Sequence, residues 1–147
     1  MFLYKPYQVL LLAALSLLIG GFLSAKGTID LRFHDTYFVI DHVQFYLLLS
    51  IPAFILWTIY LLARNILLSQ LMTWIHVALT LLAIGAFICL PLFSYPPRYV
   101  DVSPWSTFNE FQRTNQIMAG IALIFTLAQL ILIANIVGGI VRRLRRR

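Results

Sequence analysis

Charged residues are scarce in this chain, and acidic residues are the scarcest. Of its 147 residues, 11 are Lys or Arg and 5 are Asp or Glu, whereas 61% are hydrophobic and the mean hydropathy is +0.89. A soluble globular domain is about half apolar and about a quarter charged. The composition therefore argues against an ordinary soluble domain and favours a protein embedded in a lipid bilayer.

Cysteine is almost absent as well, since Cys89 stands alone within an apolar run. A single cysteine excludes an intramolecular disulfide and a paired-thiol metal motif, and we expect Cys89 to be a small buried hydrophobic residue. The chain also lacks a glycine-rich phosphate loop, a nucleophile elbow and any low-complexity tract. These absences remove the usual sequence signatures of nucleotide binding and of serine hydrolases.

The few charges divide the chain into long uncharged stretches. Four intervals between charged residues each enclose at least 20 uncharged residues, and a helix needs about 20 apolar residues to cross the hydrocarbon core. We therefore predict an all-α integral membrane protein with a single four-helix domain over residues 1–147. The expected helices cover about 7–25, 36–63, 71–93 and 114–141, with outer loops at 26–35 and 94–113 and a basic tail at 142–147.

The first of these apolar stretches allows a second interpretation. A short basic start followed by apolar residues and Leu23-Ser24-Ala25 resembles a secretory signal. The run is longer than a typical signal core, and three more apolar stretches follow. We therefore expect a retained helix.

The charges also predict the orientation of the helices. With four spans, the two termini and the turn at Arg64 share one side, which then carries Lys5 and the RRLRRR tail, whereas every acidic residue falls on the other side. The positive-inside rule places both termini in the cytoplasm of a bacterial-type inner (plasma) membrane. The net charge of +6 is then a topology signal that also attracts anionic lipid, and we expect no nucleic-acid partner.

Ionisable residues gather at the start of one apolar run, RFHDTYFVIDHVQFYLLLS, at Arg32–Ser50. If the second helix begins early enough, His34 and His42 lie about two turns apart on one face, and Asp41 lies about 100° from His42 around the axis. The imidazole of His42 could ligate a metal or haem iron, relay protons together with Asp41, or simply form a hydrogen bond inside the bundle. Position in the helix does not decide between these roles.

His34 and Asp35 also allow two interpretations. With loop carboxylates such as Asp101 they could bind a hard divalent cation at the outer face. Alternatively, Asp35 could cap the amino end of the helix, where the dipole favours a negative charge. The sequence favours neither one.

Three polar residues lie deeper in the later apolar runs. His76 falls near the inner end of the third helix, and at ~1.5 Å per residue its depth differs from that of His42 by roughly 15–25 Å, so the two cannot share a metal ion. We expect His76 to be an interfacial or buried structural histidine. Gln129 and Asn135, in the inner half of the fourth helix, are expected to bond to a neighbouring helix.

Two segments resemble the haem–copper oxidases (cytochrome c and quinol oxidases). HDTYFVIDHVQFYLLLS, at residues 34–50, resembles the tenth-helix signature of their subunit I, and WIHVALTLLAIGAFICLPLFSYPPRYVD, at 74–101, resembles the eleventh helix with its following turn. The order and spacing agree from Arg32 to the C-terminus. The resemblance implies that the four expected helices correspond to helices nine to twelve of that family.

The same resemblance implies roles for individual residues. His42 matches the axial ligand of the high-spin haem, Arg98 matches one of two arginines that hold haem propionates, and His34 with Asp35 matches a pair near a magnesium site. Other positions depart from the family pattern: Gln44 replaces a ligand of the low-spin haem, Pro97 the other propionate arginine, and Asp41 an alanine.

The family's first eight helices, which carry the copper ligands, have no counterpart in this sequence. The resemblance therefore implies a small oxidase-subunit-I-like protein that does not reduce oxygen on its own. Because the family's twelve helices form three arcs of four, three copies could rebuild the ring as a homotrimer, with haem b bound through His42. Three alternatives stay open: a non-catalytic structural or assembly subunit of a larger membrane complex, a proton or ion path through Asp41 and His42, and a respiratory-chain oxidase subunit whose missing helices lie on a separate chain.

Overall fold

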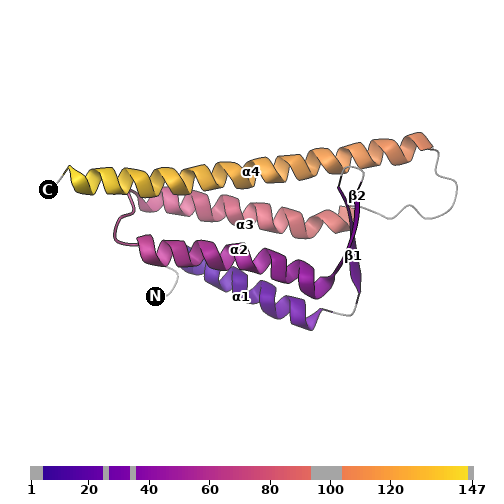
Figure 1. Ribbon diagram of the computed structural model, residues 1–147, viewed down its shortest axis with the longest axis horizontal. Helices are drawn as coiled ribbons and strands as arrows, with labels where there is room; N and C mark the ends of the chain where they lie inside the picture. The colour runs from indigo at the N-terminus through magenta and orange to yellow at the C-terminus, as the bar shows by residue number, and fades with distance from the viewer. Residues whose placement is uncertain (1–4, 25–26, 34–35, 94–103, 146–147) are drawn as a thin grey trace.

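Four helices lie side by side in the computed structural model, and a β-hairpin lies at one end of them (Figure 1). The structure describes residues 5–24, 27–33, 36–93 and 104–145. Its elements are α1 (Tyr7–Leu23), β1 (Thr28–Phe33), β2 (Thr36–Asp41), α2 (His42–Ala63), α3 (Gln70–Phe93) and α4 (Pro104–Leu144). We call the end with β1 and β2 the hairpin end. The opposite end, which carries Lys5, Arg64 and the last turn of α4, is the basic end.

Three of the helices are long and apolar enough to cross a membrane: α2, Gln70–Leu90 of α3 and Gln112–Leu144 of α4. Helix α1 is also apolar but shorter, and its 17 residues extend about 26 Å at a rise of 1.5 Å per residue. Three of the four predicted spans thus have the length and composition of membrane helices. Helix α2 is continuous through Pro52.

The helices pack mainly as two pairs, α1 on α2 and α3 on α4, with further contacts between α1 and α3. Three clusters of buried apolar residues hold the pairs together. The cluster nearest the basic end takes residues from all four helices, and the cluster nearest the hairpin end includes one residue of β1. The buried members of the cluster nearest the basic end are Tyr7, Leu10, Leu56, Tyr60, Val77 and Leu132. Those of the cluster nearest the hairpin end are Ile29, Phe45, Leu90 and Met118, and those of the third cluster are Ala14, Leu17, Ala53 and Ile84.

The β-hairpin corrects the prediction of an all-α fold. β1 and β2 are antiparallel, with Thr28 opposite Asp41 and Phe33 opposite Thr36, so the second helix begins at His42 and not at residue 36. The physical reason is that 28–33 alternates polar and apolar residues while 36–41 is rich in β-branched and aromatic residues. Only two residues separate the two stretches, which is the commonest hairpin spacing.

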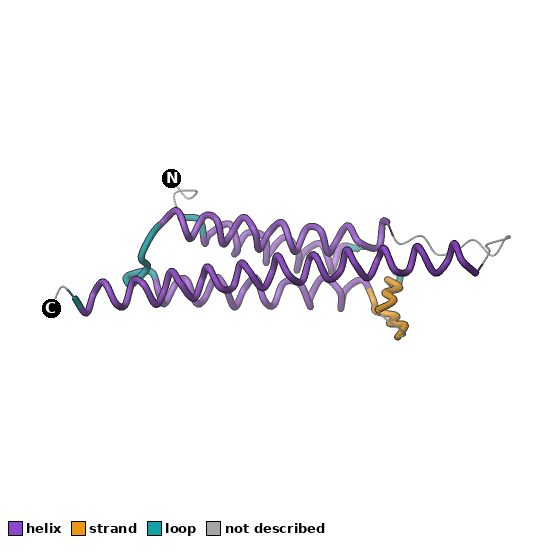
Figure 2. The backbone as a smooth tube through the Cα atoms, turned by 90° about the horizontal axis from the view of Figure 1, so that it is seen from above, coloured by secondary structure: helices purple, strands orange, loops and turns teal. Residues whose placement is uncertain are grey.

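The hairpin extends to one side of the bundle (Figure 2) and closes one part of its end. Ile29 of β1 is buried among Phe45 of α2, Leu90 of α3 and Met118 of α4, and Ile40 of β2 packs against the same cluster. The hairpin is therefore anchored to three helices by its apolar side chains.

Helix α4 corrects a second prediction. It begins at Pro104, whereas the sequence predicted a loop over 94–113; residues 94–103 lie outside the described part of the chain. Proline is favoured in the first turn of a helix, where its missing N–H costs nothing. With 41 residues, α4 is about 60 Å long at 1.5 Å per residue, and it extends past α3 at the hairpin end (Figure 1).

Cys89 is exposed, so the prediction that it is a buried residue is wrong. Its neighbour Leu90 is buried in the cluster at the hairpin end. Consecutive helical residues point about 100° apart, and the face of α3 that carries Cys89 is not covered within the chain.

The turn between α2 and α3 packs directly on α4. The backbone N–H of Leu68 donates to the carbonyl oxygen of Asn135, at 3.1 Å. One helical turn later, a Cβ on Gly139 would overlap the backbone carbonyl of Ile66. Only glycine allows this close approach of two backbones.

Candidate functional site

His42 is the first residue of α2 and is half-buried at the hairpin end. Its backbone N–H donates to the carbonyl oxygen of Gly27, at 3.2 Å. Asp41 precedes it in an extended conformation, at the N-cap position and exposed, without a capping hydrogen bond from its side chain. The condition under which His34 and His42 would share a helical face is not met, because α2 begins at His42.

The other residues singled out by the sequence at this end, His34, Asp35, Arg98 and Asp101, lie outside the described residues. The interpretation of Asp35 as a helix cap is wrong, since α2 begins at His42 and Asp41 takes the N-cap position. Binding of a divalent cation by His34 and Asp35 stays a prediction. Within the described part of the chain, no three His, Cys, Asp or Glu side chains are grouped so that they could hold a metal ion.

Aromatic residues follow His42 within one turn of α2. Phe45, one turn into α2, is buried and stacks on Phe87 of α3 with ring centroids 5.8 Å apart and an interplanar angle of 13°. Tyr46 meets Phe45 edge to face. Aromatic side chains thus pack together one turn beyond His42, at the hairpin end of α2 and α3.

A second polar site lies in the half of the bundle near the basic end. We call it the buried polar cluster; it consists of one residue of α2, three of α3 and two of α4, namely Tyr60, Thr73, His76, Thr80, Gln129 and Asn135. Thr73, His76, Thr80 and Asn135 are buried. Polar side chains inside a bundle of apolar helices need partners, and here they find them mostly on one another.

Asn135 is the centre of the hydrogen bonds in the buried polar cluster. Its side-chain amide donates to Oγ1 of Thr73, at 2.9 Å, and its Oδ1 accepts from the backbone N–H of Ser69, also at 2.9 Å. The prediction that Asn135 bonds to a neighbouring helix is confirmed. Gln129 donates to the carbonyl oxygen of Phe125 in its own helix, at 3.4 Å, and its side chain also approaches His76.

His76 and Tyr60 have incompletely satisfied polar atoms. The prediction of a buried or interfacial His76 is confirmed, because its side chain is fully buried, with Nε2 3.4 Å from Oγ1 of Thr80. Its ring centroid lies 5.4 Å from that of Tyr60. Among the described residues, Nδ1 of His76, the hydroxyl of Tyr60 and Oε1 of Gln8 have no hydrogen-bond partner of good geometry. Atoms of this kind generally bind ordered water.

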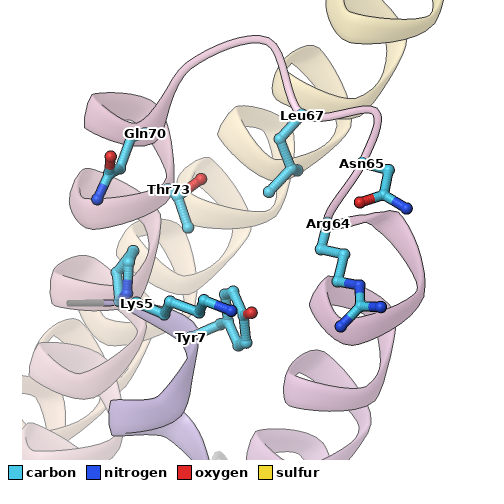
Figure 3. Close-up of a pocket in the computed structure, with 8 residues that line it drawn as sticks. Lys5, Tyr7, Arg64, Asn65, Leu67, Gln70 and Thr73 are labelled. Atoms are coloured by element: carbon cyan, nitrogen blue, oxygen red, sulfur yellow. The ribbon is translucent and has the colours of Figure 1, made fainter. Parts of the chain in front are cut away.

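An open cavity of about 600 Å³ lies at the basic end (Figure 3). Its walls come from the start of α1, the end of α2 and the start of α3. Tyr7 stacks on Tyr60, with centroids 6.2 Å apart, and Thr73 belongs to the buried polar cluster, so the cavity adjoins that cluster. The lining residues are Lys5, Pro6, Tyr7, Arg64, Asn65, Leu67, Gln70 and Thr73.

The cavity was not predicted from the sequence, and neither were Tyr60, Thr73 and Thr80 of the buried polar cluster. Thr73, His76 and Thr80 recur at intervals of three and four residues, which places them on one face of α3. This spacing within an apolar run could have indicated a polar contact inside the bundle. His76 and His42 lie at opposite ends of the bundle, so the two histidines form no common site.

No protein-family model, curated protein or solved structure significantly matches this chain.

Proposed function

We propose that this protein is a small, oxidase-subunit-I-like integral membrane protein that assembles with copies of itself, with three copies as the expected number, through the exposed face of α4. Its role is that of a structural or assembly subunit in the membrane. It does not reduce oxygen by itself.

The observation that carries this proposal is the pattern of exposed residues on α4. Its most apolar window is 17% buried within the chain, against 28% for α2 and 39% for the span in α3. The exposed residues include a run at alternating intervals of four and three: Leu123, Leu127, Leu130, Ala134, Val137 and Val141. A repeat of 3.5 residues is the pattern by which one helix packs along another.

One position of the repeat, Ala134, carries a small side chain. Alanine and other small residues at a helix interface allow membrane helices to approach closely, since association in lipid depends on packing and not on removal from water. Ala134 lies at the centre of the repeat. Because α4 contacts mainly α3 within the chain, a neighbouring chain has access to this face.

A bulky residue on this face tests the proposal. We expect Ala134→Trp to lower the number of chains per detergent-solubilised particle, measured by size-exclusion chromatography with light scattering. The matched control is Ala78→Trp, at an exposed position of α3, which should leave the number unchanged. A wild-type particle with one chain, or equal copy numbers for both variants, would contradict assembly through α4; Leu130→Trp provides a second test of the same face.

Haem b binding through His42 is the second candidate function. It is favoured by the half-buried position of His42 at the start of α2. In an oligomer, a neighbouring copy would supply further walls for the porphyrin. Protein produced with haem supplied should then show a Soret band that His42→Ala abolishes and that the monomeric Ala134→Trp variant loses as well. No Soret band in the wild-type oligomer would remove this candidate.

The other two functions drawn from the sequence gain less support from the described residues. A proton path would need polar residues leading inward from Asp41, but Asp41 is exposed and the neighbouring interior is apolar. If a separate chain completed an oxidase, a partner that carries the copper ligands would co-purify with this protein.

A further inference from the structure

We propose that the cavity at the basic end binds a phosphate group between Lys5 and Arg64. Phospholipid headgroups and free phosphate compounds share this chemistry, and the experiment below distinguishes them. The site is independent of the assembly through α4.

The two cations of the cavity come from different parts of the chain. Lys5 precedes α1 and Arg64 follows α2, and both line the cavity (Figure 3). Phosphate oxygens accept charge-assisted hydrogen bonds from ammonium and guanidinium groups, which are about twice as strong as bonds between neutral groups. Two cations that line one cavity are therefore suited to a phosphate bound within it.

Among the described side chains, Lys5 and Arg64 have no acidic counterpart nearby. The five acidic residues of the sequence occur at positions 30, 35, 41, 101 and 110. Among the described side chains only Asp41 is acidic, and it lies at the hairpin end, at the far end of α2 from Arg64. An anion from outside the chain is thus the natural counter-charge for Lys5 and Arg64.

The backbone around the cavity also favours an anion. Helix α1, with 17 residues, and helix α3, with 24 residues, both begin at the cavity wall, and neither has an acidic residue in its first turn. The amino end of a helix carries a partial positive charge and the carboxyl end a partial negative one, so the two amino ends outweigh the single carboxyl end of α2 at the same wall. Asn65 and Gln70 add polar side chains to the cavity wall. The hydroxyl of Thr73 already donates to the carbonyl oxygen of Ser69 and accepts from Asn135, so Thr73 contributes shape to the wall and no donor.

The size and surroundings of the cavity fit a lipid headgroup. A volume of about 600 Å³ is within the roughly 300–1,000 Å³ common for small-molecule sites. Two apolar side chains, Leu62 in the last turn of α2 and Leu71 in the first turn of α3, are strongly exposed. In the sequence they are close neighbours of Arg64 and Gln70, which line the cavity. Such residues provide a surface for acyl chains once a headgroup is bound.

The experiment uses the full chain in detergent and measures ligand-induced changes of intrinsic fluorescence. The probes are phosphatidylglycerol, phosphatidylcholine and sn-glycerol 3-phosphate. We expect phosphatidylglycerol to bind at least about tenfold more tightly to the wild type than to Lys5→Gln/Arg64→Gln, since each charged partner contributes strongly to phosphate binding. The matched control is Arg142→Gln/Arg143→Gln, which removes the same charge from α4 at the same end.

The outcomes decide between the site and its sources. A loss of binding in the Lys5/Arg64 variant but not in the Arg142/Arg143 variant supports the site. Binding of phosphatidylglycerol without binding of sn-glycerol 3-phosphate identifies a lipid headgroup as the ligand. Comparable binding of both identifies the free phosphate group. Equal losses in the two double variants, or no binding of any probe by the wild type, would overturn the proposal. Thermal unfolding checks that both variants fold, and the single Arg64→Gln variant replaces the double one if it does not.

Discussion

The contact between α4 and the turn after α2 can be tested by adding a single methyl group. At Gly139 the new Cβ of alanine would overlap the backbone carbonyl of Ile66. Alanine gains about 0.5–1 kcal/mol over glycine within a helix, but overpacking costs about 1–3 kcal/mol. Moving the turn away would also weaken the hydrogen bond from Leu68 to Asn135, for a further cost of about 0.5–1.5 kcal/mol.

These opposing terms give a net destabilisation of about 1–3 kcal/mol for Gly139→Ala. The matched control is Gly120→Ala in the same helix, where an added Cβ meets no atom within 4 Å; it should stabilise the protein by about 0.5–1 kcal/mol. Unfolding in mixed detergent–SDS micelles, followed by far-UV circular dichroism, measures both. If Gly139→Ala is as stable as Gly120→Ala, the turn does not contact α4 in the way described.

Three further predictions concern other parts of the molecule. Asn135→Ala should destabilise the protein by about 1–3 kcal/mol, because it leaves the backbone N–H of Ser69 unpaired. The control Thr126→Ala, at an exposed position, should change the unfolding free energy by less than about 0.5 kcal/mol. Equal effects would contradict the hydrogen bonds from Asn135 to Thr73 and Ser69. Tyr60→Phe should change the unfolding free energy by less than about 1 kcal/mol, because the hydroxyl has no hydrogen-bond partner of good geometry among the described residues. A larger loss would show that the hydroxyl is bonded. In spheroplasts, with Cys89 replaced by alanine, a membrane-impermeant maleimide should label the Asp41→Cys variant and not the Arg145→Cys variant. The reverse pattern would contradict the predicted orientation.

The helices could be predicted because their main determinant is local. Charges at Lys5, Arg64 and the basic tail mark the ends of apolar runs, and the structure places helix ends close to these positions. A run of this length can bury its backbone polar groups only as a helix when it lies in lipid. Neither the partner of a helix nor the rotation about its axis follows from this requirement.

The hairpin escaped prediction because a strand depends on a partner outside its own sequence. Residues 36–41 continue without a break into the apolar run of α2, so periodicity alone cannot tell a strand from the start of a helix. The alternation of polar and apolar residues at 28–33 was the available signal. The resemblance to an oxidase helix favoured the helical interpretation instead.

The contacts of Asn135 illustrate the same limit within the helices. Its polarity in an apolar run indicated that it would bond to another helix, but the choice of Thr73 and Ser69 as partners depends on how α4 packs against α3. The cavity between Lys5 and Arg64 likewise forms only when the start of α1 meets the turn after α2. Residues that act together across distant segments are found from the fold.

The central claim, that copies of this protein assemble in the membrane, is tested most directly by a native mass spectrum of the wild-type chain released from detergent. The account predicts a protein mass of three times the 16.9 kDa of one chain. A spectrum that contains only the single chain, under conditions in which the protein is folded, would contradict it.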